Sequence, residues 1–210
     1  ASDAGLIPMF YPDYKSVEGE HQTKMSDYWH TELDNKKGLT VVEIINAAYN
    51  GDIKGLYIMG ENPAMSDPNA NHAREALARL DCLVVQDIFL TETAYLADVV
   101  LPASAFPEKT GTFTNTDRRV QLARKAINPP GDAKQDLWII QELANRMGLN
   151  WNYQGPDEVY DELSGCMDSL KNISWERLVN EGAVTYPSDG ENKPGNEVIF
   201  GEGFPTKNKK

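Results

Sequence analysis

The sequence predicts an α/β fold built on a doubly wound, mainly parallel sheet, with helical additions toward the C-terminus. Short apolar runs at residues 55–59, 82–86 and 98–101 predict three strands. Helical patterns separate these runs, and strands that alternate with helices favour a parallel sheet. Because the runs do not alternate strictly between apolar and polar residues, we expect strands that are buried on both faces.

The first part of the chain predicts an irregular lead segment followed by two helices. Residues 1–38 are rich in tyrosine, proline, histidine and glycine, which favours irregular structure. Thr40 can cap a helix over residues 41–50, because apolar residues follow it at helical spacing and a glycine comes directly after. A second helix is expected over residues 67–80, with Asp67 as its N-cap and a proline in its first turn.

The α/β domain is expected to span residues 39–150, and a helical extension should follow over residues 151–182. Within the domain, Asp132 predicts the start of a helix over residues 133–147. Residues 183–210 show no periodic pattern, and proline, glycine and asparagine are frequent there. We therefore expect a linker or a loose tail at this end.

Composition restricts the classes of partner. A net charge of −12 repels phosphate backbones, so we expect no nucleic-acid partner. Cys82 and Cys166 belong to no CxxC motif or Cys/His cluster, so the chain alone is not expected to build an iron–sulfur or zinc site. With no apolar run of about 18 residues and no basic-then-apolar signal, we expect no membrane segment and a cytoplasmic protein.

Three polar loops follow the three predicted strands. They are Gly60-Glu61-Asn62, Gln86-Asp87 and residues 102–111. In an open parallel sheet, ligands bind in the crevice outside the carboxyl ends of the strands. We therefore expect the binding site at this edge, in a partial dinucleotide-binding-like domain.

The side chains in these loops suit the recognition of a purine nucleotide. The Asp87 carboxylate could accept two parallel N–H bonds, such as those from the ring N1–H and the exocyclic amine of guanine. It could equally form a turn after the strand. Gln86 and Asn62 could read other ring edges, and Lys109 suits a pyrophosphate or carboxylate. Asp136 could act in the same way or simply favour a helix N-terminus.

Several well-known catalytic motifs are missing from the sequence. It contains no GxGxxG, no GxxxxGK[ST] and no GxSxG pattern, so the NAD fingerprint, the P-loop and the hydrolase elbow are all absent. We therefore predict a dinucleotide-type crevice, with no catalytic or metal-binding residue in this chain.

Five ordered motifs resemble the large subunit of molybdopterin oxidoreductases, and most of all the catalytic (alpha) subunit of formate dehydrogenases. The motifs lie at Tyr57–Pro63, Leu83–Ala97, Asp98–Ser104, Glu108–Arg119 and Pro130–Met147. The resemblance implies a bis(molybdopterin guanine dinucleotide) cofactor holding molybdenum or tungsten, and formate oxidation by the whole enzyme. It also implies partners: the remaining domains of the same subunit, and electron-transfer subunits with iron–sulfur clusters or flavin. The positions that the resemblance assigns to cofactor contacts are Gly60, Glu61, Asn62, Gln86, Asp87, Thr91, Lys109 and Asp136.

The sequence also departs from that family. The four-cysteine cluster motif, the metal-ligating cysteine or selenocysteine followed by histidine, and the arginine of the substrate pocket are all missing. The chain is therefore expected to be an internal or truncated fragment, inactive alone, with the iron–sulfur cluster elsewhere in the enzyme. Three alternatives stay open: a fragment of a nitrate reductase-type enzyme, a non-catalytic scaffold like the related subunit of respiratory complex I, or a stand-alone nucleotide-binding module.

Overall fold

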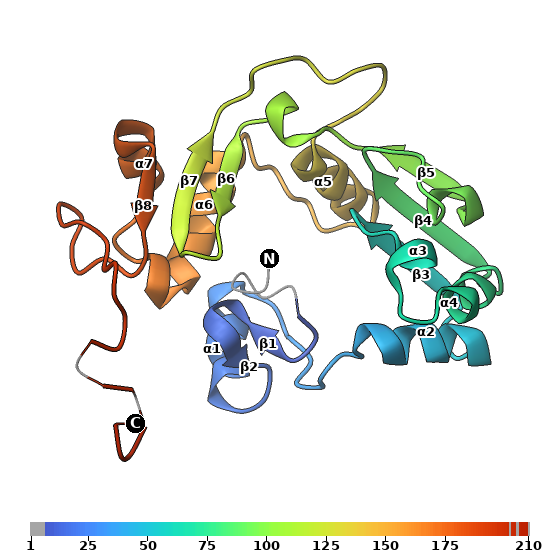
Figure 1. The fold of residues 1–210 in the computed structure, drawn as a ribbon, viewed down its shortest axis with the longest axis horizontal. Helices are drawn as coiled ribbons and strands as arrows, with labels where there is room; N and C mark the ends of the chain where they lie inside the picture. Colours follow the sequence, from blue (N-terminus) through green and yellow to red (C-terminus); the bar gives the residue numbers. More distant parts are fainter. Residues whose placement is uncertain (1–6, 202, 205, 210) are drawn as a thin grey trace.

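The computed structural model describes residues 7–201, 203–204 and 206–209 (Figure 1). In this part of the chain the strands form a parallel sheet, an antiparallel sheet and a two-stranded hairpin. We call the parallel sheet and the helices packed on it the parallel unit. The antiparallel sheet and its helices form the antiparallel unit, at the other end of the molecule in Figure 1.

The parallel unit confirms the three predicted strands. β3 (Gly55–Met59), β4 (Cys82–Asp87) and β5 (Val99–Pro102) pair in the order β3-β4-β5, and both pairs are parallel. One face of the sheet packs against α2 (Val41–Asn50) and α4 (Ala70–Leu77). The buried residues between the sheet and these helices include Ile45, Ala48, Ala73, Leu77, Leu83 and Val85.

The first helix of this unit begins and ends where the sequence predicts. The Thr40 side chain accepts a hydrogen bond from the Glu43 backbone N–H, while the Glu43 carboxylate accepts one from Thr40 N at 2.7 Å. Gly51 ends the helix in the left-handed conformation, at φ 83°. Such reciprocal capping satisfies backbone donors that the first turn would otherwise leave unpaired.

The second predicted helix, over residues 67–80, is wrong in its boundaries. The structure has two shorter helices instead, α3 (Pro63–Ser66) and α4. Asp67 lies between them, and its Oδ1 accepts a hydrogen bond from Asn69 N at 3.1 Å. Asn69 then caps α4 by accepting from His72 N at 3.3 Å, so the second of two neighbouring capping residues starts the helix.

The expectation of strands buried on both faces is also wrong. The register places Tyr57, Val84 and Val99 side by side on the face opposite the helices. Tyr57 is 42% exposed and Val99 is 45% exposed, and Cys82 at the start of β4 is exposed as well. The face opposite α2 and α4 is therefore covered only in part: Tyr57 and Val99 are exposed there, whereas Gln86, two residues after Val84, is fully buried beside Asp136.

The antiparallel unit gathers strands from distant parts of the sequence. β6 (Gly111–Thr114) pairs with β7 (Arg119–Ala123), and β7 pairs with β8 (Ala183–Thr185). Two helices, α6 (Pro156–Cys166) and α7 (Trp175–Glu181), pack on this sheet. Its buried core consists of Val120, Tyr160, Met167, Leu170, Ile173, Leu178 and Val184.

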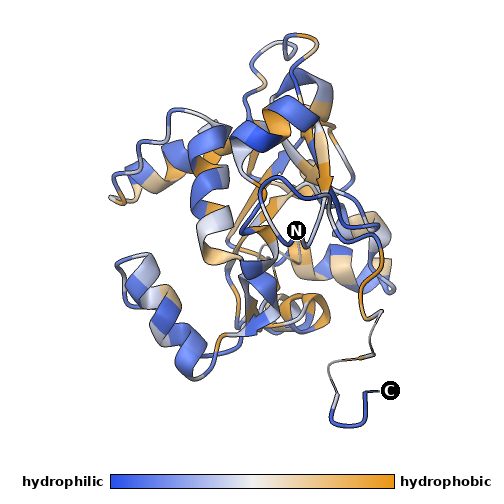
Figure 2. Ribbon diagram, turned by 90° about the vertical axis from the view of Figure 1, so that its left-hand side faces the viewer, coloured by the Kyte–Doolittle hydropathy of each residue, from blue (hydrophilic) through white to orange (hydrophobic). Residues whose placement is uncertain are grey.

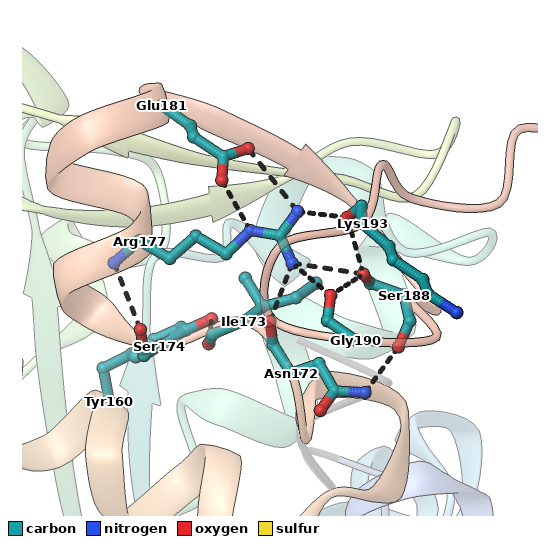
Figure 3. A network of polar contacts seen from close by, with 9 residues as sticks. All are labelled: Tyr160, Asn172, Ile173, Ser174, Arg177, Glu181, Ser188, Gly190 and Lys193. Atoms are coloured by element: carbon teal, nitrogen blue, oxygen red, sulfur yellow. Dashed lines mark hydrogen bonds and ion pairs between the residues drawn. The ribbon is translucent and has the colours of Figure 1, made fainter.

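The sequence analysis placed residues 183–210 in a linker or tail, and the first part of this segment is folded instead. β8 belongs to the sheet, and the loop after it surrounds the side chain of Arg177 (Figure 3). The Arg177 guanidinium is buried and donates to the carbonyls of Asn172 at 2.8 Å and Gly190 at 3.2 Å, and to Ser188 Oγ at 3.1 Å. A buried guanidinium needs several acceptors. The loop after β8 supplies Ser188, Gly190 and Lys193, while the others come from Asn172 and Glu181.

The lead segment and the helix predicted at residues 133–147 also differ from expectation. The described part of the lead contains a hairpin and α1 (Glu20–Tyr28), while residues 1–6 lie outside the described residues. α5 (Asp136–Arg146) begins later than predicted, because Lys134 is held by backbone bonds next to β5. The remaining elements are β1 (Phe10–Tyr11), β2 (Lys15–Ser16), and the 3-10 turns η1 (Pro12–Tyr14), η2 (Ala94–Leu96), η3 (Phe106–Glu108) and η4 (Asp168–Leu170).

Figure 2 shows hydrophobic and hydrophilic residues in turn along the helices, as expected for helices that bury one side. No helix in the described residues combines the length and hydropathy that a membrane crossing requires.

Candidate functional site

The carboxyl ends of β3, β4 and β5 lie next to one another. Met59 is registered with Gln86, and Gln86 with Leu101. Gly60 N donates to the Gln86 carbonyl at 2.9 Å, and Ala103 N donates to the Asp87 carbonyl at 3.0 Å. The structure therefore brings the three predicted loops to the same edge of the sheet.

A chain of polar contacts connects three of the predicted site residues. Gln86 is fully buried; its Oε1 accepts a hydrogen bond from the Tyr57 hydroxyl, and its Nε2 donates to Asp136 Oδ1 at 2.6 Å. Lys109 Nζ donates to the other Asp136 oxygen and to the Ser104 carbonyl at 3.0 Å. These contacts fix Gln86, Lys109 and Asp136 relative to one another.

The charges and pKa values in this set of polar contacts follow from the partial burial of its residues. Burial raises the pKa of Tyr57, and the nearby Asp136 carboxylate raises it further, so the hydroxyl stays a donor. Lys109 and Asp136 are 23% and 30% exposed at their side chains, and their charges offset each other. The Lys109 ammonium still keeps one N–H that no described residue accepts.

Ser104 lies beside Lys109 and was not among the predicted cofactor contacts. It is fully buried, and its Oγ has no hydrogen-bond partner among the described residues. An unpaired buried hydroxyl costs about 1–3 kcal/mol, so such groups are rare unless something else satisfies them. This unpaired hydroxyl is the feature of the edge that most directly indicates a ligand.

Asn62 connects the first loop to the second. Its Oδ1 accepts from Thr93 N at 3.1 Å and Thr93 Oγ1 at 2.8 Å, and its Nδ2 donates to Glu92 Oε2 at 2.7 Å. The hydrogen bond from Asn62 lowers the pKa of Glu92. Because Thr93 is fully buried, its hydrogen bonds to Asn62 fix the first loop against the segment that follows β4.

Asp87 forms a turn, which is the alternative that its position after a strand left open. Its Oδ1 accepts from Ile88 N at 2.7 Å and Phe89 N at 3.2 Å. Its Oδ2 accepts from no described residue. Because Oδ1 already holds two N–H groups, Oδ2 is the oxygen that remains for a ligand.

The remaining predicted residues, Gly60, Glu61 and Thr91, lie at the same edge and make fewer side-chain contacts. Gly60 has φ 65°, a backbone conformation that favours glycine, and Glu61 next to it is exposed. Thr91 Oγ1 accepts from Ala94 N at 3.2 Å and so supports the turn η2.

Four further residues lie at this edge that the sequence analysis did not predict as cofactor contacts: Tyr57, Glu92, Thr93 and Ser104. Their position at the carboxyl edge of the sheet depends on the strand register and the loop conformations.

A parallel sheet with helices packed on it and a polar carboxyl edge is an α/β arrangement in which ligands bind outside the carboxyl ends of the strands. A family model of molybdopterin oxidoreductases matches residues 8–146, and the chain belongs to this family. The match spans the parallel unit and all eight predicted site residues.

Among its curated relatives, an F420-dependent formate dehydrogenase subunit alpha from Methanocaldococcus jannaschii is 46% identical over 210 residues, covering 99% of this chain and 31% of the relative. A putative formate dehydrogenase of Bacillus subtilis is 41% identical over 212 residues, covering 100% of this chain and 21% of the relative. The chain thus spans less than a third of the length of these relatives.

A solved structure, acetylene hydratase from Pelobacter acetylenicus, matches with a TM-score of 0.58 and 25% identity, covering 75% of this chain and 22% of that chain.

Proposed function

We propose that this chain is part of the catalytic (alpha) subunit of a molybdenum- or tungsten-containing formate dehydrogenase. We further propose that the carboxyl edge of its parallel sheet contacts the guanine dinucleotide of a bis(molybdopterin guanine dinucleotide) cofactor. The family match and the names of the relatives support this assignment. Since the chain spans less than a third of those relatives, the activity belongs to a longer polypeptide, and we expect no formate-dependent dye reduction by this chain alone.

The donors and acceptors at this edge fit a nucleotide diphosphate. The unpaired hydroxyl of Ser104 and the remaining N–H of Lys109 suit phosphate oxygens, which accept hydrogen bonds. The Asp87 Oδ2 suits an N–H of a purine ring. The observation that carries the proposal is the fully buried Ser104 hydroxyl beside the fixed Lys109.

This proposal gives each site residue a role toward the cofactor. Lys109 binds the pyrophosphate, while Asp136 and Gln86 hold Lys109 in place. Asp87 accepts from the guanine ring, and Asn62 and Thr91 support the loops on either side of it. Gly60 and Glu61 would border the dinucleotide, because their turn lies at the same edge of the sheet.

When bound, such a cofactor supplies the metal that takes two electrons from formate. We propose that the electrons leave through a subunit with iron–sulfur clusters or flavin. We also propose a cytoplasmic location, supported by the two cysteines, which are both free thiols. Metal analysis of the longer polypeptide separates this proposal from a scaffold relative, which would hold neither molybdenum nor tungsten.

Titration of this chain with GDP and ADP by calorimetry tests the recognition of guanine. We expect GDP to bind about tenfold more tightly than ADP, because only guanine presents a ring N–H and an amine to Asp87. Asp87→Asn should remove most of this preference. Asp34→Asn is the matched control, since Asp34 also accepts a backbone N–H in an exposed turn, from Lys36 at 3.0 Å. Equal affinities for GDP and ADP in the unaltered chain would contradict guanine recognition.

A further inference from the structure

A pocket lies between the end of α1, the segment that joins α5 to α6, and α6 itself. It has a volume of about 990 Å³, which is at the upper end of the range for small-molecule sites in proteins. None of the eight predicted site residues lines it. Four of the side chains that do are large aromatic ones, so we call it the aromatic pocket: Tyr28, Trp29, Trp151 and Tyr153.

The four rings form two pairs that come from distant parts of the chain. Tyr28 and Trp29 have ring centroids 6.4 Å apart at an interplanar angle of 69°. Trp151 and Tyr153 have centroids 6.1 Å apart at an angle of 74°. Because the rings of each pair are nearly perpendicular, each pair presents aromatic surface in two directions. Aromatic cages that bind cations through the negative faces of their rings have walls of this kind.

Hydrogen bonds within the chain hold both pairs in place. The Tyr28 hydroxyl donates to the Glu162 carbonyl at 2.8 Å, and a Cβ at Gly165 would clash with that hydroxyl, so the glycine makes room for it. On the other side, Gln141 of α5 accepts a hydrogen bond from Tyr153 N at 2.7 Å. The fold therefore fixes the walls of the pocket, and a ligand that binds there would have to order few side chains.

Glu162 gives the aromatic pocket a negative charge. It is half-buried, and its Oε2 accepts from the Tyr153 hydroxyl at 2.6 Å, while its Oε1 accepts from no described residue. Within the described part of the chain, no lysine or arginine lines the pocket or forms an ion pair with Glu162. Burial raises the pKa of Tyr153, and the hydrogen bond to Glu162 and its charge raise it further, as expected where the potential is negative. A partly desolvated carboxylate without a positive partner is unfavourable, so a cation would be stabilised here.

We propose that the aromatic pocket binds a small organic cation whose nitrogen carries apolar substituents, an alkylammonium ion of the choline type. The rings contact the substituents and attract the positive charge, and Glu162 supplies the opposite charge. A bare metal ion fits less well, because it needs several oxygen ligands and the pocket offers one carboxylate. The net charge of −12 also favours a cation over an anion. This binding does not depend on the proposed function.

Calorimetric titration of this chain with choline chloride tests the proposal. The comparison ligand is 3,3-dimethyl-1-butanol, which has nearly the same shape as choline but carries carbon in place of the charged nitrogen. Because His30 also lines the pocket, both titrations are made at about pH 8, above the ordinary range of histidine titration. We expect choline to bind saturably and at least about tenfold more tightly than the neutral alcohol. Equal affinities, or no saturable binding of choline, would overturn the proposal.

A pair of tryptophan substitutions locates the binding. Trp151→Leu removes one aromatic wall and should weaken choline binding at least about tenfold. Trp138→Leu is the matched control, because Trp138 is 48% exposed, close to the 40% of Trp151, and does not line the aromatic pocket. We expect the control to bind choline as the unaltered chain does. Equal losses in the two variants, or no loss in Trp151→Leu, would show that choline binds elsewhere and would overturn the proposal.

A charge-removing substitution tests the carboxylate. Glu162→Gln keeps an acceptor for the Tyr153 hydroxyl but removes the negative charge, so choline affinity should fall about fivefold while that of the neutral alcohol stays the same. Glu176→Gln is the control, since Glu176 is exposed on α7 and does not line the pocket. If Glu162→Gln does not fold, added sodium chloride serves instead, and it should weaken the binding of choline but not of the alcohol. Choline binding that responds to neither change would overturn the proposal.

Discussion

The parallel and antiparallel units differ at one buried polar side chain each, Ser104 in the first and Arg177 in the second. In the antiparallel unit, the Arg177 guanidinium is surrounded by acceptors from its own helix and from the loop after β8 (Figure 3). In the parallel unit, Ser104 keeps an unpaired buried hydroxyl, and one edge of the sheet stays open. The antiparallel unit satisfies itself, whereas the parallel unit leaves groups that another molecule or another part of the polypeptide can satisfy.

The largest expected effect is on the antiparallel unit. Arg177→Met should lower the free energy of unfolding by about 3 kcal/mol, because it leaves several buried carbonyls without a donor. Urea denaturation followed by tryptophan fluorescence measures this loss. Arg124→Met is the control: Arg124 is exposed and donates to the Val179 carbonyl at 3.1 Å, so its loss should cost less than about 0.5 kcal/mol. Similar losses in both variants would remove the contrast between the units.

A pair of serine substitutions compares the two units directly. Ser188→Ala should cost about 1 kcal/mol, because Ser188 Oγ accepts from Arg177 and donates to the Gly190 carbonyl at 2.9 Å. Ser104→Ala should leave the stability of the chain unchanged or raise it by up to about 1 kcal/mol, because no bond is lost. It should also weaken GDP binding. A large loss of stability in Ser104→Ala would mean that its hydroxyl is paired within the chain.

The smallest effect concerns pH. Burial, followed by the hydrogen bond to Glu162, raises the pKa of Tyr153 to about 12. Because the folded-state pKa lies above the ordinary value of 10, the stabilisation is complete below pH 10 and is lost as the pH rises toward 12. The stability difference between the unaltered chain and Tyr153→Phe should therefore shrink over this range. A difference that does not change with pH would show that Tyr153 titrates normally.

Local sequence patterns were sufficient to predict the three strands, the helix α2 with its caps, and the three polar loops after the strands. These features depend on neighbouring residues: Thr40 and Gly51 bound their own helix, and each strand ends at its own turn residues. For the second helix, the sequence analysis took Asp67 as the N-cap, whereas Asn69 caps α4 in the structure. The helix α5 begins late because backbone bonds to β5 hold Lys134, and no local signal reveals them.

The candidate site was likewise predicted from the sequence only in part. The sequence analysis named Gln86, Lys109 and Asp136 as site residues, but it could not show that Asp136 bonds directly to both Gln86 and Lys109, or that Tyr57 and Ser104 extend this set of contacts. Those contacts depend on strand register and on segments far apart in the chain, such as Gln86 and Asp136, which lie 50 residues apart. For Asp87, the sequence left a turn and a ligand contact as equal alternatives, and the structure gives one carboxylate oxygen to the turn.

The pairing of Lys109 with Asp136 has a consequence for selectivity. A cation that already has an anionic neighbour gains little from a small ion such as inorganic phosphate. Under the proposed function, a molecule that also bonds to Ser104 and Asp87 would bind more tightly than a small ion that meets Lys109 alone. The affinity of the edge would then depend on the length of a ligand and on the positions of its polar groups. Small anions in solution would be weak competitors for binding.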